Sequence, residues 1–246
     1  FRNSNLYDSK SKMNIERIKG LKLFRKYRKA NLVNNFINEN SNIRSVLTDH
    51  WKSLELLNKE QLNKSKTICL LHSKEINHEK GSSLNKRLIK STDKANFIIA
   101  NSNFTKELAI KVGINSSKIK VIFPGVPKPK VIEDKFKTEA ESILKDAFPK
   151  IITVARLEKR KSHDKVLMAI KNLKAKFPNI KYICIGFGKE ENNLKKLSKQ
   201  LSIEKEVVFL KNIDENLKLA LISTSNLFLM PSRIDKKSVE GFGISY

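Results

Sequence analysis

The sequence predicts an α/β protein with a parallel, doubly wound sheet in each half. Short apolar runs of strand length alternate with segments of helical periodicity along the 246 residues, and this alternation is typical of parallel strands joined by helices. Prolines and a glycine at 124–129 interrupt the alternation and predict an interdomain linker. We therefore expect an N-terminal domain over 1–125, a linker over 126–134 and a C-terminal domain over 135–246.

The expected elements follow one another in a regular order. Each expected strand is a short apolar run, and each expected helix has apolar residues at helical spacing. In the N-terminal half these criteria predict strands at 46–48, 67–71, 97–100 and 120–123 and helices at about 14–37, 51–63, 82–91 and 103–112. In the C-terminal half they predict a helix near 136–147, strands at 150–155, 181–185, 206–210 and 227–230, and a helical pattern from 166.

Two cations follow the first strand of the C-terminal half. Arg156 ends the strand and Lys161 lies five residues later. Open parallel sheets bind ligands at the carboxyl ends of their strands. A guanidinium fork and a mobile ammonium could together neutralise a diphosphate leaving group as a glycosidic bond breaks. The alternative is that a chain so rich in lysine carries such residues there by chance.

The last strand leads into a glycine-bearing segment. Pro231 and Ser232 end the strand, and Glu240 precedes 241–244, which is expected to open a helix. Free amides at a helix N-terminus form an anion site, and a neighbouring carboxylate can accept hydrogen bonds from sugar hydroxyls. Alternatively, the glycines make a tight turn and Glu240 is an ordinary acid of a first helical turn. Gly186 and Gly188 follow another strand, and most such glycines only end a strand.

Taken in order, these motifs resemble glycosyltransferase family 4, whose members are retaining enzymes of the GT-B fold. The motifs are Arg156-Leu157 with Lys161, Gly186-x-Gly188, Pro231-Ser232 and Glu240-Gly241-Phe242-Gly243. Upstream, Asp93-Lys94-Ala95, Ile98-Ile99-Ala100-Asn101-Ser102, Phe104-Thr105 and Val121-Ile122-x-Pro124-Gly125-Val126 resemble the end of that family's N-terminal domain. The resemblance implies two Rossmann-like domains facing a cleft, and it runs from about residue 41 to the last residue.

The resemblance also implies site residues. Arg156 and Lys161 would bind the donor diphosphate, together with the amides of Gly241, Phe242, Gly243 and Ile244. Glu240 would contact the donor sugar as the first glutamate of an E-x7-E motif, and His72 would face the reacting sugar. Gly186, Gly188 and Ser232 would lie near the donor nucleotide. The donor would be a nucleotide-diphosphate sugar, with neither cofactor nor metal.

The sequence departs from the family pattern in two places. Ser162 stands where a glycine commonly follows the lysine, and this is expected to be harmless because serine can begin a helix. The second glutamate of the E-x7-E motif would fall two residues beyond Tyr246. Because the chain also begins at Phe1 without a methionine, we expect both domains to be incomplete.

The formal net charge of +25 suggests an anionic partner. Only nine of the 50 basic residues are arginine, the charge is spread along the chain, and no nucleic-acid-binding motif is present, so a specific nucleic-acid partner is not expected. The expected helix at 14–37 combines Ile15, Ile18 and Phe36 with many lysines and could lie on an anionic membrane surface. Alternatively, it packs its apolar stripe on the sheet. Without a spanning run, the expected location is the cytoplasm, peripheral to the inner face of the membrane.

The cysteines and histidines indicate no metal chemistry. Cys69 and Cys184 lie in apolar strand runs and are expected to be buried thiols. His50, His72 and His78 match no metal-ligand spacing, and there is no Asp-x-Asp pair of the kind that serves metal-dependent GT-A transferases.

The predicted function is therefore hexosyl transfer, with retention, from a nucleotide-diphosphate sugar to a glycan or lipid-linked acceptor hydroxyl in cell-envelope or polysaccharide biosynthesis. Two alternatives stay open at this point. One is a GT-B fold nucleotide-sugar epimerase, and the other is a basic binding protein without catalysis.

Overall fold

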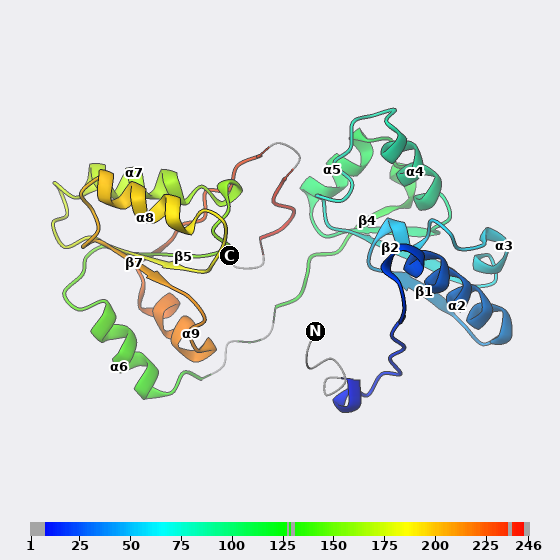
Figure 1. Cartoon of the computed structure of the whole chain (residues 1–246), viewed down its shortest axis with the longest axis horizontal. Coiled ribbons are helices and arrows are strands. Elements are labelled where there is room, and N and C mark those ends of the chain that lie inside the picture. Colours follow the sequence, from blue (N-terminus) through cyan, green and yellow to red (C-terminus); the bar gives the residue numbers. More distant parts are fainter. Residues whose placement is uncertain (1–7, 127, 129–130, 236–237, 244–246) are drawn as a thin grey trace. The chain divides into compact units, whose positions relative to one another are not determined.

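The computed structural model describes residues 8–126, 128, 131–235 and 238–243 and divides the chain into two compact units, Phe1–Ile122 and Phe123–Tyr246 (Figure 1). Each unit has its own parallel sheet and its own buried core. This confirms the α/β class with parallel sheets predicted from the alternation of elements.

Unit 1 contains a parallel sheet whose described strands lie in sequence order. The strands are β1 (Ser45–Thr48), β2 (Lys66–Leu71), β3 (Phe97–Ala100) and β4 (Ile119–Val121). The helices are α2 (Arg25–Glu39), α3 (Lys59–Leu62), α4 (Ser83–Thr92) and α5 (Asn103–Lys111), with the short turns η1 (Lys22–Phe24), η2 (Trp51–Ser53) and η3 (Ser116–Lys118). The register pairs Leu71 with Ala100, so β2 and β3 end side by side.

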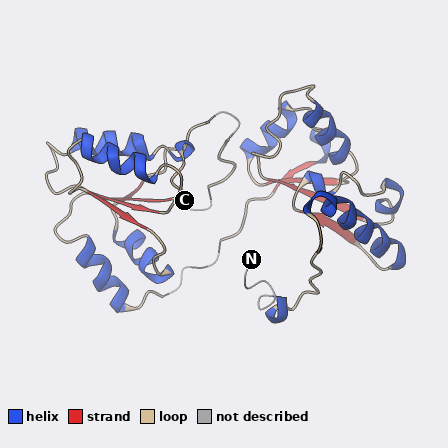
Figure 2. Cartoon of the chain, in the orientation of Figure 1, coloured by secondary structure: helices blue, strands red, loops and turns tan. Residues whose placement is uncertain are grey.

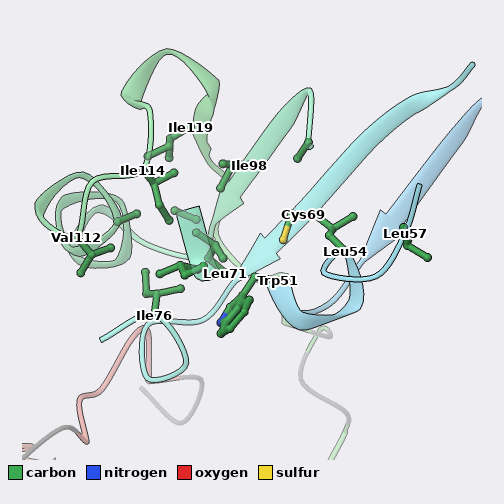
Figure 3. Packing of buried hydrophobic residues seen from close by; sticks show 14 of the residues in the cluster. Trp51, Leu54, Leu57, Cys69, Leu71, Ile76, Ile98, Val112, Ile114 and Ile119 are labelled. Atoms are coloured by element: carbon green, nitrogen blue, oxygen red, sulfur yellow. The ribbon is translucent and has the colours of Figure 1, made fainter. Parts of the chain in front are cut away.

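Apolar side chains from the sheet and from the loop after β1 form the core of unit 1. Trp51, Leu54, Cys69 and Leu71 are fully buried and lie close together in Figure 3. The Trp51 indole Nε1 donates to the carbonyl oxygen of Glu75 at 2.9 Å, so the polar edge of this ring is also satisfied. The core therefore fixes the loops that leave the carboxyl ends of β1 and β2.

The predicted bounds of two helices in unit 1 were wrong. The helix expected at 14–37 begins only at Arg25: residues 14–19 are not helical, and Gly20 after them has a φ of +87°, which a helix does not allow. The helix expected at 51–63 is interrupted: α3 is short, and the Asn58 side chain caps it by accepting from the Glu60 amide. In α2, Ala30 and Ile37 are buried and Val33 packs on the core, which supports the alternative of a helix packed on its domain.

Unit 2 is doubly wound. Its strands are β5 (Lys150–Val154), β6 (Lys181–Ile185), β7 (Val207–Leu210) and β8 (Leu227–Phe228), all parallel in the order β7-β6-β5-β8. The helices are α6 (Asp134–Ile143), α7 (His163–Leu173), α8 (Glu191–Gln200) and α9 (Glu215–Thr224), with the turn η4 (Lys159–Lys161) before α7. Helices α7 and α8 cover one face of the sheet and α6 and α9 the other (Figures 1 and 2).

The strands expected from apolar runs are confirmed to within a residue or two at each end. The largest differences are at β4, which ends at Val121 although strand was expected to 123, and at β8, which pairs only over Leu227–Phe228 although strand was expected to 230. Met230 is buried all the same. In the described part of the chain, no helix is long and apolar enough to cross a membrane.

Candidate functional site

The candidate site of unit 2 lies where the strand order reverses. The chain runs outward from β5 to β6 and β7 on one side, whereas β8 pairs with β5 on the other, through Ile151 opposite Leu227 and Ile152 opposite Phe228. Loops that leave the carboxyl ends of two such strands diverge, and the crevice between them is the usual ligand site of open α/β sheets. Here these loops are 155–161 after β5 and 229–235 after β8.

Two buried cations converge on one carboxylate at this position. Lys161 Nζ and Arg160 Nη1 both donate to Oε2 of Glu240, and Lys161 Nζ also lies 3.3 Å from the sulfur of Met230. The side chains of Arg160 and Lys161 are 8% and 9% exposed, and that of Glu240 is 23% exposed. Lys161 and Glu240 were both predicted as site residues, and the structure brings them together.

The electrostatics of Glu240 reflect both burial and pairing. Burial by itself would raise the pKa of its carboxyl group, but the hydrogen bonds from Lys161 and Arg160 outweigh burial, so the pKa lies below its ordinary value. Glu240 is therefore ionised near neutral pH. The three groups carry a net charge of +1 in a largely buried place, which favours an anionic ligand.

Arg156 lies at the edge of the same site but points to solvent. Its side chain is 65% exposed, and its Nη1 lies 2.9 Å from Oε1 of Glu158. Arg160, which the sequence analysis missed, lies between the two pairs, with its Nη2 3.8 Å from Oε2 of Glu158. Its position in the sequence could have suggested a role in the site, because Arg160 immediately precedes Lys161. Nothing in the sequence alone separates it from the exposed Lys159 on its other side.

Unsatisfied polar atoms also gather around the site. Within the described residues, Arg160 Nε, Ser162 Oγ and Ser232 Oγ are buried and have no hydrogen-bond partner. Buried polar atoms are normally paired with protein or with water. Ser232, predicted to lie near the nucleotide, follows β8, and the amide of Arg233 beside it donates to the carbonyl oxygen of Arg160 at 2.8 Å.

Ser162 has a backbone conformation that favours glycine. Its φ of 56° and ψ of 30° lie in the left-handed region that favours glycine. The residue precedes α7, but its side chain makes no capping hydrogen bond. Ser162 therefore stands at the start of α7, as expected, but it does so through a left-handed backbone conformation and without a capping hydrogen bond from its side chain.

Gly186 and Gly188 allow the loop after β6 to touch the loop that carries Arg156. A Cβ on Gly188 would lie 2.8 Å from the backbone nitrogen and carbon of Leu157, and one on Gly186 would lie 3.0 Å from the carbonyl carbon of Ala155. The two loops are joined by a hydrogen bond from the Leu157 amide to the Phe187 carbonyl oxygen at 3.0 Å. These glycines therefore do more than end a strand: because they lack a Cβ, the loop after β5 can pack directly against the loop after β6.

A buried hydrogen-bond network lies beneath this loop, and the sequence analysis missed it. His163 Nδ1 lies 3.0 Å from the Tyr182 hydroxyl, and its Nε2 lies 3.3 Å from the carbonyl oxygen of Arg156. The Tyr182 hydroxyl donates to Thr153 Oγ1 at 2.9 Å, and Thr153 donates to the Leu229 carbonyl oxygen. Burial lowers the pKa of His163. The network ties the loops after β5 and β8 to the sheet.

The helix expected to open after Glu240 is not seen in the described residues. Gly241 and Phe242 form a bend, and Gly243 has a φ of +78°. Ile244 lies outside the described residues, so the predicted amide cradle at 241–244 stays a prediction.

In unit 1, His72 lies at the carboxyl end of β2. Its Nε2 is 2.9 Å from Oδ1 of Asp49, which follows β1, and its amide donates to Glu75 Oε1 at 2.6 Å. The next residue, Ser73, is fully buried with a φ of +86°, and its hydroxyl is hydrogen-bonded to that of Thr105 at the start of α5. The structure therefore holds His72 half-exposed at the sheet edge where ligands are expected.

Cys69 and Cys184 are free and buried, as predicted. Burial raises the pKa of Cys69 to about 11 and that of Cys184 to about 12. No three His, Cys, Asp or Glu side chains in the described part of the chain gather closely enough to hold a metal ion.

Comparison with known proteins shows which family part of this chain resembles. Residues 134–246 match the family model of glycosyl transferases group 1. The fold is of the GT-B type, since Anabaena HepE in complex with UDP superposes on 93% of this chain with a TM-score of 0.72. The matched segment contains all of the candidate residues of unit 2.

The curated and solved relatives are distant. A GDP-mannose-dependent monoacylated alpha-(1-6)-phosphatidylinositol monomannoside mannosyltransferase of Corynebacterium glutamicum is 29% identical over 120 residues, 48% of this chain and 31% of that protein. Anabaena HepE in complex with UDP superposes with a TM-score of 0.72 at 16% identity, over 93% of this chain and 63% of that one. The pneumococcal O-GlcNAc transferase GtfA in complex with UDP and GlcNAc gives a TM-score of 0.59 at 16% identity, over 87% and 42%. The chain thus spans less than two thirds of the length of each of these proteins.

Proposed function

We propose that this chain belongs to a family 4 glycosyltransferase, which moves a hexose-type sugar from a nucleotide-diphosphate donor to an acceptor hydroxyl and retains the anomeric configuration. The observation that carries the proposal is the pair of buried cations, Lys161 and Arg160, that meet Glu240 at the strand-order reversal of unit 2. The match of this segment to glycosyl transferases group 1 supports it. Relatives that use GDP-mannose or bind UDP support a nucleotide-sugar donor.

In the proposed reaction, Lys161 and Arg156 neutralise the diphosphate as the bond from the sugar to its oxygen breaks. The departing diphosphate accepts the proton of the acceptor hydroxyl, which attacks from the same face. The amides of 241–244 assist the two cations. No metal or other cofactor is needed in this scheme, because side-chain cations and amides carry the counter-charge.

Glu240 and His72 are proposed to position the sugar. Both cations donate to Oε2 of Glu240, and no hydrogen bond to Oε1 is seen in the described part of the chain, so Oε1 is the oxygen proposed to accept from a sugar hydroxyl. His72 is held from one side by Asp49 and presents a half-exposed ring. Gly186, Gly188 and Ser232 are proposed to border the nucleotide.

Binding and turnover of nucleotide sugars test the proposal. The chain would be heated with UDP-, GDP- and ADP-sugars, and a ligand at 100 times its dissociation constant should stabilise it by about 2.7 kcal/mol. Arg156→Ala and Lys161→Ala should abolish the shift, whereas Lys159→Ala removes an exposed cation from the same turn and should leave it. Proton NMR of the product then reports the anomeric configuration, and an inverted product would contradict retention.

Other outcomes would favour the alternatives. Conversion of the donor into an epimer without an acceptor would indicate a nucleotide-sugar epimerase. Polyanion binding that is steeply salt-dependent and survives Arg156→Ala and Lys161→Ala, with no nucleotide binding, would indicate a basic binding protein.

We also propose that unit 1 binds an anionic membrane surface through a basic apolar segment, residues 21–27. Every residue of this segment is exposed, and it alternates Leu, Phe and Tyr with Lys and Arg. Leu21 and Leu23 are 74% and 77% exposed. Apolar side chains surrounded by cations suit the boundary between headgroups and acyl chains. Such a location fits a lipid-linked acceptor in cell-envelope or polysaccharide biosynthesis at the cytoplasmic face of the membrane.

Vesicle co-sedimentation tests this surface. Vesicles containing phosphatidylglycerol should bind the chain, and vesicles of phosphatidylcholine alone should bind it far less. Leu23→Ser should weaken binding several-fold because it removes buried apolar area in the complex. Met168→Ser, which changes an exposed apolar residue of unit 2, is the matched control. Equal binding by both variants and the wild type would refute the assignment of this segment.

A further inference from the structure

Arg160 lies at the centre of a chain of alternating charges. Its Nη1 donates to Glu240, and its Nη2 lies 3.8 Å from Glu158. Glu158 in turn pairs with Arg156 at 2.9 Å, and Glu240 accepts from Lys161. The order is Arg156, Glu158, Arg160, Glu240 and Lys161, so a cation stands at each end and a third stands in the middle.

The middle cation is fixed more firmly than the outer arginine. The Arg160 side chain is 8% exposed against 65% for Arg156. The backbone of Arg160 is held as well, since its carbonyl oxygen accepts from the Arg233 amide at 2.8 Å. Arg233 is itself paired with Asp164 of α7 at 2.9 Å. Arg160 therefore has little freedom to turn toward a ligand in solvent.

The charge balance gives this buried cation a role. If Arg156 and Lys161 bind a diphosphate, Glu158 loses its ion pair with Arg156, and Glu240 loses its ion pair with Lys161. A partly buried carboxylate that loses its cation is strongly destabilised. Arg160 faces both carboxylates and can keep them paired while the outer cations change partner.

We propose that Arg160 is a positioning residue of the nucleotide site, which holds Glu240 and Glu158 in place and so releases Lys161 and Arg156 to the donor diphosphate. The inference rests on the proposed function. It also gives a reason for two buried cations on one carboxylate: one binds the ligand and the other stays with Glu240. Because the Arg160 side chain is buried between carboxylates, it acts through them and does not touch the diphosphate.

Calorimetric titration of the whole chain with UDP, GDP and ADP tests the role. Arg160→Gln should weaken the affinity by about tenfold, a usual effect for residues of one salt-bridge network. In the Glu240→Gln background the same change should cost about threefold or less, because the carboxylate that competes for Lys161 is gone. Arg160→Lys keeps the charge and should return the dissociation constant to within about threefold of the wild type.

Lys159→Gln is the matched control, because it removes an exposed cation one residue away in the same turn. Its affinity should stay within about twofold of the wild type, as expected for an exposed charge at moderate salt. Thermal unfolding of each variant shows whether it is folded, and Arg160→Met replaces Arg160→Gln should the latter not fold.

The outcomes separate this inference from the proposed function. If the wild type binds none of UDP, GDP and ADP, the proposed function fails and the inference with it. If the wild type binds and Arg160→Gln binds equally well, only the inference is overturned. If Arg160→Gln weakens the nucleotide affinity as much in the Glu240→Gln background as in the wild type, the inference is also overturned, since Arg160 would then contact the diphosphate directly. A loss that vanishes in that background and is rescued by Arg160→Lys establishes the positioning role.

Discussion

Alanine at Gly188 should destabilise unit 2 because the loop after β6 lies against backbone atoms. The added Cβ would lie 2.8 Å from the nitrogen and carbonyl carbon of Leu157, and closer still to its oxygen, whereas Cβ atoms in proteins essentially never come nearer than 3.0 Å to such atoms. The backbone on the other side cannot rotate away as a side chain could. The two loops would therefore have to separate.

The magnitude follows from the contacts that would be lost. Separation stretches the hydrogen bonds from the Leu157 amide to Phe187 O and from the Glu190 amide to Leu157 O, both 3.0 Å long. At about 1 kcal/mol each, with roughly 1–2 kcal/mol for overpacking and a gain of about 0.5 kcal/mol from the stiffer unfolded chain, the net loss is about 3 kcal/mol. For a unit of this size the unfolding temperature should fall by about 10 °C.

Differential scanning calorimetry of four glycine variants isolates the cause. At Gly188 and Gly186 an added Cβ would be crowded, and Gly186 also has a φ of +151°. The other two positions have open space around them: Gly81 has a φ of +84°, and Gly125 has no positive φ. Gly125→Ala should be neutral to within about 0.5 kcal/mol, and Gly81→Ala should lose about 1 kcal/mol from backbone strain alone. If Gly188→Ala proves as stable as Gly125→Ala, the reasoning from close approach is refuted.

Three further predictions concern titratable groups. Because the pKa of Glu240 is lower in the folded chain, its pairing should stabilise the fold at pH values above its ordinary pKa of 4.5, and this stabilisation should be lost at lower pH. Glu240→Gln should lower the free energy of unfolding by about 2 kcal/mol at pH 7, and the difference between variant and wild type should shrink near pH 3. Because burial lowers the pKa of His163, the wild type should lose stability as the pH falls below 6.5. In His163→Gln the free energy of unfolding should fall less steeply between pH 6.5 and 5, and an unchanged slope would contradict this. Cys69 and Cys184 should react with a thiol reagent at pH 8 only upon unfolding, so rapid modification of the native chain would show that burial does not protect them.

The elements could be predicted largely because their signals are local. A run such as Ile151 to Val154 identifies a strand from its own residues, and the polar residues after it mark the sheet edge where ligands bind. Failures also had local causes that apolar periodicity does not report. Gly20 has a positive φ inside the helix expected from residue 14, and the Asn58 cap set the start of α3.

The candidate site was predictable only in part. Lys161, Glu240 and Arg156 were expected, and the structure places Lys161 against Glu240 and Arg156 on the same loop. The part played by Arg160 could not be predicted, because neighbouring cations in a turn look alike in sequence and differ only in the direction of their side chains.

The sequence by itself determined the alternation of strands and helices and the polar residues that follow each strand, since both depend on near neighbours in the chain. Only the tertiary structure decided which of those residues meet. Glu240 reaches Arg160 from 80 positions away because β8 pairs beside β5. Likewise, Gly186 must be a glycine because Ala155 lies against it. Contacts of this kind depend on strand order and register, which arise from the packing of the whole unit and not from any one segment.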